Sequence, residues 1–134
     1  MILVDTSVLI DAMRRKRNPK SDVLKQCVES GVDFGFSAFT MQEILQGCKT
    51  AVEYYTALRF FRGYTVLYPE PGPTLYACAA LMFASLRQKG VTIRSPIDTL
   101  IAATAILHDI PLLHNDRDFD AIAAQFPALR ILEG

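Results

Sequence analysis

Short apolar runs alternate along the chain with longer stretches in which apolar residues recur every three or four positions. The short runs are followed by polar or turn residues, and several are rich in β-branched or aromatic residues, which is typical of buried strands. They predict strands at residues 2–4, 34–38, 65–68, 111–114 and 130–132. The longer stretches predict helices at residues 7–15, 21–30, 40–47, 52–61, 74–89, 96–108 and 119–125.

This alternation of strands and helices predicts an α/β fold in which helices cover both faces of a parallel sheet. The connections between parallel strands are expected to be right-handed, because the twist of the strands favours that hand. The length of 134 residues predicts one domain over residues 1–134. In open parallel sheets, functional sites form beyond the carboxyl ends of the strands, so candidate residues are sought at that edge.

The composition narrows the class of protein without naming it. Apolar residues make up 51% of the chain, which excludes a disordered protein. Lys plus Arg and Asp plus Glu each number 14, whereas domains that bind nucleic acid are often basic overall. Any basic surface must therefore be local, and one candidate is the cluster of Arg14, Arg15, Lys16, Arg17 and Lys20.

The cysteines and the apolar segments favour a cytoplasmic protein. Cys27, Cys48 and Cys78 are scattered and form no C-x-x-C pair, which fits free thiols in a reducing compartment. The apolar N-terminus has no basic start and is interrupted by Asp5, unlike a signal peptide. The longest uncharged run, residues 71–86, is too short to span a bilayer. We therefore expect a soluble chain that does not enter the membrane.

Acidic residues lie close to the ends of four widely separated elements. They are Asp5 after the first strand, Glu43 and Asp98 in the first turns of two helices, and Asp116 and Asp118 after the fourth strand. If the strands are parallel, these acids converge at one edge, where their mutual repulsion calls for a cation. Hard oxygen ligands suit Mg²⁺ or Mn²⁺, which activate water and offset charge on a phosphodiester. The two histidines stand apart from the cysteines, so a zinc site is not expected.

Each acid also has a purely structural interpretation. Glu43 lies three residues after Thr40, as in a capping box, and Asp98 follows Ser95-Pro96 in a first helical turn. Asp118 would favour a helix N-terminus in the same way, and Asp5 could cap the helix that follows it. The joint pattern is more informative than any single acid, because independent caps need not all fall at one edge.

Four segments in this order resemble the motifs of the PIN-domain family. They are Val-Asp-Thr-Ser-Val-Leu-Ile-Asp at 4–11, Gln-Glu-Ile-Leu-Gln-Gly at 42–47, Asp-Thr-Leu-Ile-Ala-Ala at 98–103 and Leu-His-Asn-Asp-Arg-Asp-Phe at 113–119. Any one of them is a weak signal, but their order and spacing match the family over nearly the whole chain. The short length, without an appended domain, is similar to that of VapC-like toxins of toxin–antitoxin pairs.

The resemblance implies a three-layer α/β/α sandwich whose parallel sheet has about five strands in the order 3-2-1-4-5. It implies an endoribonuclease that depends on Mg²⁺ or Mn²⁺. The matching acids are Asp5, Glu43, Asp98 and Asp116, with Asp118 as an additional acid, and Thr6 matches a hydroxyl beside the first acid. All of them except Glu43 and Thr6 would be metal ligands. Many members carry Thr or Ser where this chain has His114.

The resemblance also implies partners: a structured RNA such as tRNA or rRNA, a cognate antitoxin that blocks the acids with a basic side chain, and a second copy of the chain. The helix at 74–89 is apolar almost all round, which fits either burial within the monomer or a homodimer interface. The aromatic stretch at 54–64 fits core packing or a groove for an antitoxin helix. Arg94 and Arg117 flank the acids and could meet the scissile phosphate, and the basic cluster at 14–20 could hold RNA phosphates.

Other functions fit the same residues less well. A housekeeping PIN nuclease in RNA maturation, or a PIN-fold binding module that has lost catalysis, stay open as alternatives. A phosphatase of the haloacid-dehalogenase type would need a second Asp where this chain has Ser7. A receiver domain would need an acidic pair before its phosphorylated Asp and a late Lys after a strand, and neither is evident.

Overall fold

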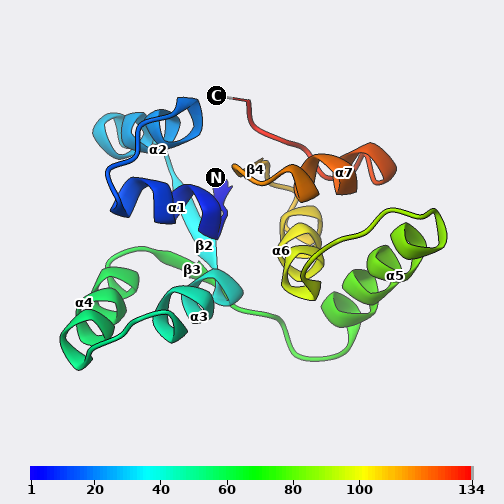
Figure 1. Cartoon of the computed structure of the whole chain (residues 1–134), viewed down its shortest axis with the longest axis horizontal. Helices are drawn as coiled ribbons and strands as arrows, with labels where there is room; N and C mark the ends of the chain where they lie inside the picture. The colour runs from blue at the N-terminus through cyan, green and yellow to red at the C-terminus, as the bar shows by residue number, and fades with distance from the viewer. Residues whose placement is uncertain (134) are drawn as a thin grey trace.

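The computed structural model describes residues 1–133. Its strands are β1 (Ile2–Val4), β2 (Phe34–Ser37), β3 (Thr65–Leu67) and β4 (Leu112–Leu113). Its helices are α1 (Thr6–Met13), α2 (Pro19–Ser30), α3 (Ala38–Gln46), α4 (Ala51–Arg62), α5 (Thr74–Gln88), α6 (Pro96–Leu107) and α7 (Arg117–Gln125) (Figure 1). Every helix predicted from the periodicity of apolar residues is present, with small differences at the ends.

The sheet is parallel throughout, as predicted, with the order β3-β2-β1-β4. The central strand β1 pairs with β2 through Leu3 and Gly35 and with β4 through Val4 and Leu113. Gly35 permits the close approach of β3, because a Cβ atom there would lie 2.9 Å from the carbonyl oxygen of Thr65. The short strand β1 therefore has a neighbour on each side, and its carboxyl end lies near the middle of the sheet edge.

The expectation of a fifth strand at residues 130–132 is wrong. The segment keeps the expected parallel position beside β4 but forms only a single bridge between Leu112 and Ile131. Its two backbone hydrogen bonds, from Leu112 N to Arg130 O and from Leu132 N to Leu112 O, are both 2.9 Å long. A longer fifth strand does not form because β4 has only two residues, and one of them, Leu112, makes the bridge.

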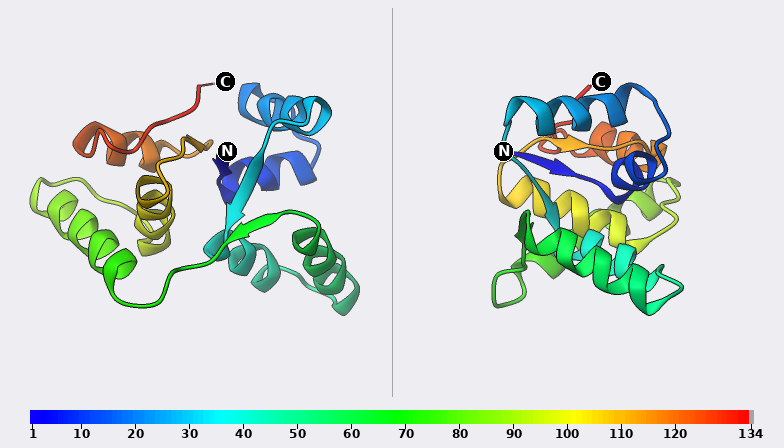
Figure 2. Two further views of the ribbon diagram at one scale, coloured as in Figure 1. Left: turned by 180° about the vertical axis from the view of Figure 1, so that it is seen from behind. Right: turned by 90° about the vertical axis from the view of Figure 1, so that its left-hand side faces the viewer.

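Two hydrophobic clusters cover the two faces of the sheet and make the three layers of the fold. Neighbouring residues of a strand point to opposite faces, so Leu3 packs with residues of α5, α6 and α7, whereas Val4 packs with residues of α1 to α4. Figure 1 shows the two groups of helices on either side of the strands, and Figure 2 shows the same division from behind. The sandwich expected from the sequence is confirmed.

The start of α3 differs from the sequence prediction in a way that affects the site. The helix begins at Ala38 rather than at residue 40, and Ser37 is its N-cap, with its Oγ accepting a hydrogen bond of 3.1 Å from Thr40 N. The capping box expected between Thr40 and Glu43 is therefore wrong. Thr40 lies within the first turn with a fully buried side chain, which leaves Glu43 free for a role outside the cap.

The apolar helix α5 is buried on one side only. Leu75, Ala79, Met82 and Leu86 pack into the cluster beneath it, whereas Tyr76 and Leu81 on the outer side are 51% and 66% exposed. Burial within the monomer thus accounts for part of its apolar surface and leaves the rest uncovered in this chain. None of the helices in residues 1–133 combines the length and the hydrophobicity that a membrane-spanning helix needs.

Candidate active site

The acids predicted from the sequence meet at the carboxyl edge of the sheet. Asp5 directly follows β1 and is the N-cap of α1, with its side chain accepting a hydrogen bond from Ser7 N. Asp116 follows β4 and is the N-cap of α7, and Asp98 lies in the first turn of α6, which Ser95 caps. Three helix N-termini thus hold acids, where the helix dipole favours negative charge. Asp5, Asp98 and Asp116 therefore have the structural role that the sequence offered, and this role leaves their carboxylates at the edge where a functional site was predicted.

Asp98, Asp116 and Asp118 form the tightest group in the site. Each contributes a carboxylate oxygen, and these oxygens lie within 4.8 Å of one another. It is the one such group of possible metal ligands among residues 1–133. Several carboxylate oxygens at this spacing are the hard donors that Mg²⁺ and Mn²⁺ prefer, so the residues fit a divalent cation.

The pKa of Asp98 is raised by burial and by the charges of the other acids in the site. Burial raises the pKa of its carboxyl to about 7, and the negative charges of four more acids add to the effect. Those acids are, in order of their contribution, Asp5, Asp116, Asp118 and Glu43. The other four sequence-predicted acids therefore all raise the pKa of Asp98, and near neutral pH its carboxyl is only partly ionised in the folded chain.

Asp5 is the most deeply buried of the acids, with 4% of its surface exposed. Burial raises the pKa of its carboxyl, and hydrogen bonds from Ser7 act in the opposite direction. Its Oδ2 accepts both Ser7 N, at 3.0 Å, and Ser7 Oγ, at 2.6 Å. Asp5 lies outside the group of three within 4.8 Å, and its link to that group is its negative charge, which raises the pKa of Asp98.

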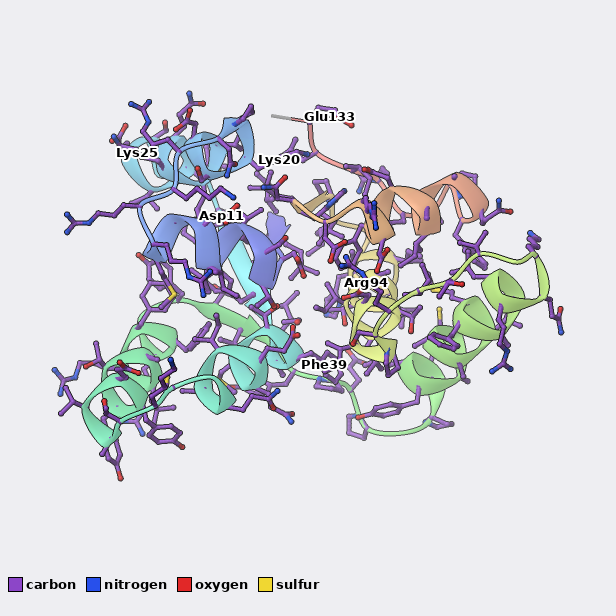
Figure 3. All side chains as sticks on the ribbon, viewed as in Figure 1. Asp11, Lys20, Lys25, Phe39, Arg94 and Glu133 are labelled. Atoms are coloured by element: carbon purple, nitrogen blue, oxygen red, sulfur yellow. The ribbon has the colours of Figure 1, made fainter. Side chains whose placement is uncertain are left out.

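Arg94 flanks the acids, as predicted, and pairs with two of them. Figure 3 shows Arg94 between α6 and α7. Its Nη2 donates to Asp116 Oδ1 at 2.7 Å and its Nε donates to Asp118 Oδ2 at 2.9 Å. Burial would raise the pKa of Asp118, but the bonds from Arg94 and the charge of Arg117 lower it overall. The guanidinium, on a side chain that is 61% exposed, thus neutralises part of the cluster from the solvent side.

Glu43 is held by a chain of buried hydroxyls. Thr6 Oγ1 donates to Glu43 Oε1 at 2.7 Å and lies 3.1 Å from Thr40 Oγ1. Thr40 in turn is bonded to the hydroxyl of Ser37 at the start of α3. The sequence predicts a role for Thr6 beside the first acid but none for Thr40, because the spacing from Thr40 to Glu43 imitates a capping box.

His114, at the position where many members of the resembled family carry Thr or Ser, supports the loop rather than facing the acids. Its Nδ1 accepts a hydrogen bond of 3.1 Å from Asp116 N, and its ring lies 5.2 Å from that of Phe119. Its Nε2 is 3.2 Å from Asp120 Oδ1 but lacks the geometry of a hydrogen bond. Burial lowers the pKa of the imidazole, which favours the neutral ring that can accept from Asp116 N.

Comparison with known proteins identifies relatives over almost the full length. The PIN domain family model matches residues 2–125. VapC ribonuclease Mb1587 of Mycobacterium bovis and ribonuclease VapC11 of Mycobacterium tuberculosis are each 32% identical over 124 residues, which is 92% of this chain and 92% of each relative. Among solved structures, VapBC2 of Rickettsia felis, bound to a DNA fragment from its promoter, has a TM-score of 0.75 at 20% identity, with 98% of both chains covered. VapBC-1 of nontypeable Haemophilus influenzae has a TM-score of 0.71 at 20% identity, with 99% of this chain and 98% of that chain covered.

Proposed function

Because the chain belongs to the PIN-domain family and, within it, to the VapC ribonucleases, we propose that it is the metal-dependent endoribonuclease toxin of a toxin–antitoxin pair. Its substrate would be a structured RNA such as tRNA or rRNA, cut by hydrolysis of a phosphodiester bond. The observation that supports this most strongly is the group of three carboxylates within 4.8 Å, joined by Asp5 and Glu43 through their charges on Asp98.

A divalent cation, Mg²⁺ or Mn²⁺, would be held by Asp98 and Asp116, with Asp5 and Asp118 completing the set of acidic ligands. When bound, such an ion supplies an activated water and offsets the charge that develops on the phosphate. The pKa of Asp98, about 7, means that the site gives up a proton when the cation enters. Asp118 is already paired with Arg94. To be a ligand of the cation, its carboxylate would either leave Arg94 or bind the cation and Arg94 together.

We propose that the catalytic residues are Asp5, Glu43, Asp98 and Asp116, and that nearby arginines bind the substrate. Glu43 is anchored through Oε1 by Thr6, which leaves Oε2 to accept the proton of the attacking water. The exposed guanidiniums of Arg94 and Arg117 lie beside the acids, where they would hold the scissile phosphate.

An apolar groove beside the acidic site supports the proposal of an antitoxin partner. It has a volume of about 610 Å³ and is lined by residues of α1, α3 and α4, among them Ile44, Val52 and Phe61 and the proposed catalytic residue Glu43. An amphipathic antitoxin helix lying in this groove would bring a basic side chain to the acids and silence them. Phe61 belongs to the core, whereas Val52, at 77% exposed, is free to contact a partner.

The uncovered side of α5 fits the second copy expected in this family. Tyr76 and Leu81 there form apolar surface that nothing in the described chain covers. We expect the protein to be a homodimer through this helix and Leu81→Arg to be a monomer in light-scattering chromatography. A wild-type monomer in the same measurement would exclude the dimer.

The test is cleavage of total bacterial RNA by the purified, antitoxin-free chain with Mg²⁺, Mn²⁺ or EDTA. We expect discrete fragments with either metal, none with EDTA, and none from Asp5→Asn. Asp33→Asn, which changes an exposed acid in the loop before β2, is the matched control and should cleave like the wild type. Intact RNA after incubation with folded, metal-loaded wild type would contradict the proposal.

A further inference from the structure

The hydroxyl of Ser7 joins the two halves of the acidic site. We propose that Ser7 is a positioning residue, which fixes the loop of Asp116 against Asp5 so that both carboxylates face one cation. The site's metal requirement rests on the proposed function, but the positioning of the loop does not depend on which RNA is cut.

Ser7 Oγ uses its hydrogen-bonding capacity on both sides of the site. It donates its single hydrogen to Asp5 Oδ2 at 2.6 Å, and it accepts the backbone N–H of Asn115 at 2.9 Å. The first bond fixes the acid that follows β1, and the second fixes the residue directly before Asp116. One side-chain atom therefore sets the separation between carboxylates that lie more than a hundred residues apart in sequence.

Asp11 secures the same loop one helical turn further along α1. Residues four apart share one face of a helix, and here Ser7 and Asp11 both contact Asn115. Asp11 Oδ2 accepts Asn115 Nδ2 at 3.0 Å and also accepts Asn18 Nδ2 at 2.9 Å. Asn115 is thus held through its backbone by Ser7 and through its side chain by Asp11, and Asn18, the N-cap of α2, completes the connection.

The loop depends on these bonds because packing does not fix it from the solvent side. Asn115 is exposed, and the strand before it has only two residues. From the other side, His114 holds the amide of Asp116. Removal of the Ser7 hydroxyl would delete the hydrogen bonds from Ser7 Oγ to Asp5 and from the Asn115 amide to Ser7 Oγ. Of the two hydrogen bonds from Ser7 to Asp5, the one from the Ser7 amide would remain. Loss of such a hydrogen-bond partner to a metal ligand typically weakens metal binding ~10- to 100-fold.

The experiment compares Ser7→Ala with Ser7→Thr, which keeps the hydroxyl, and with Ser30→Ala as a control. Within residues 1–133, the one hydrogen-bond partner of Ser30 Oγ is Gln26 O at the far end of α2. Mn²⁺ affinity is measured by calorimetry, and hydrogen exchange of the Asn115 amide is measured by NMR in EDTA. We expect Ser7→Ala to bind Mn²⁺ ~10- to 100-fold more weakly and to exchange the Asn115 amide faster. Ser7→Thr should restore both values to near the wild type, and Ser30→Ala should change neither.

Unchanged Mn²⁺ affinity in a folded Ser7→Ala variant would overturn the proposal, as would a wild type that binds no Mn²⁺ or a loss that Ser7→Thr does not restore. If Ser7→Ala fails to fold by circular dichroism, Asp11→Ala tests the same hold on Asn115, with a smaller loss of affinity expected. A wild type that binds Mn²⁺ but leaves RNA intact would contradict the proposed ribonuclease activity alone, and the Mn²⁺ affinities would still decide the role of Ser7.

Discussion

The crowding of acids around Asp98 predicts that the metal-free chain is destabilised by the charge of this one carboxyl. Asp98→Asn keeps the shape of the side chain and removes the charge. In EDTA at pH 8 we therefore expect Asp98→Asn to be more stable than the wild type, although it removes a residue of the proposed catalytic set. The gain arises because burial and neighbouring carboxylates disfavour the ionised form in the folded state only.

The size of the effect follows from the pKa. A pKa of about 7 in the folded chain against 3.8 in the unfolded chain corresponds to at most about 4 kcal/mol at high pH. Asp98 is only partly buried, so solvent screening reduces this figure, and we expect about 2 kcal/mol. For a chain of this length, that is a rise in Tm of about 6 °C.

The dependence on pH has a defined sign. Between about pH 4 and pH 7 the folded wild type keeps a proton that the unfolded chain has lost, so its free energy of unfolding falls as the pH rises. The advantage of Asp98→Asn should be absent below about pH 4, grow through this interval and level off above pH 7. With millimolar Mn²⁺ the order should reverse at pH 8, because the cation binds the folded wild type and stabilises it.

The assay is thermal unfolding followed by circular dichroism from pH 4 to pH 8, in EDTA and in Mn²⁺, with Asp33→Asn as the control for loss of an exposed charge. An Asp98→Asn variant that is no more stable than the wild type in EDTA at pH 8 would show that the charge of Asp98 does not destabilise the metal-free chain. So would a gain in stability that does not vary with pH.

Three further variants test separate parts of the site. Thr6→Val should lower kcat ~10- to 100-fold with little change in KM, because Glu43 loses the hydroxyl that orients it. Steady-state cleavage kinetics measure both constants, and an unchanged kcat would show that Thr6 has no such role. Arg94→Gln should bind Mn²⁺ severalfold more tightly in calorimetry at low salt, because the guanidinium competes with the cation for two carboxylates. The same variant should raise KM for RNA, because it loses a positive charge that would hold the phosphate. Weaker Mn²⁺ binding by the variant would contradict the first expectation. Val52→Glu should weaken antitoxin binding at least ~10-fold by placing a charge in the apolar groove, and it should leave the cleavage of RNA unchanged. If the variant binds the antitoxin as tightly as the wild type does, the antitoxin binds elsewhere.

Local sequence signals identified most of the fold and the positions of the acids. Asp5, Ser95 and Pro96 stand at element boundaries that neighbouring residues specify, and the structure has them there. The parallel order of the strands followed because each helix is long enough to cross from one strand to the next. The carboxyl edge was therefore predictable as the meeting place of the acids.

Other features depend on contacts between distant segments and carry no local signal. The spacing from Thr40 to Glu43 imitates a capping box, and only the hydroxyl of Thr6 across the site shows that both residues belong to another network. The ion pairs of Arg94 join the loop before α6 to the start of α7, which no spacing along the chain reveals. The absence of a full fifth strand follows from the brevity of β4, whose apolar run is longer in sequence than the segment that pairs.

We propose that the acids at the carboxyl edge of the sheet together form one divalent-metal site. Anomalous diffraction from crystals soaked in Mn²⁺ tests it most directly, because the ion is located without reference to activity. We expect a peak within coordination distance of the carboxylates of Asp98 and Asp116, and no peak there in crystals of Asp98→Asn. Crystals of active wild-type protein that hold no ion among these acids at saturating Mn²⁺ would contradict it.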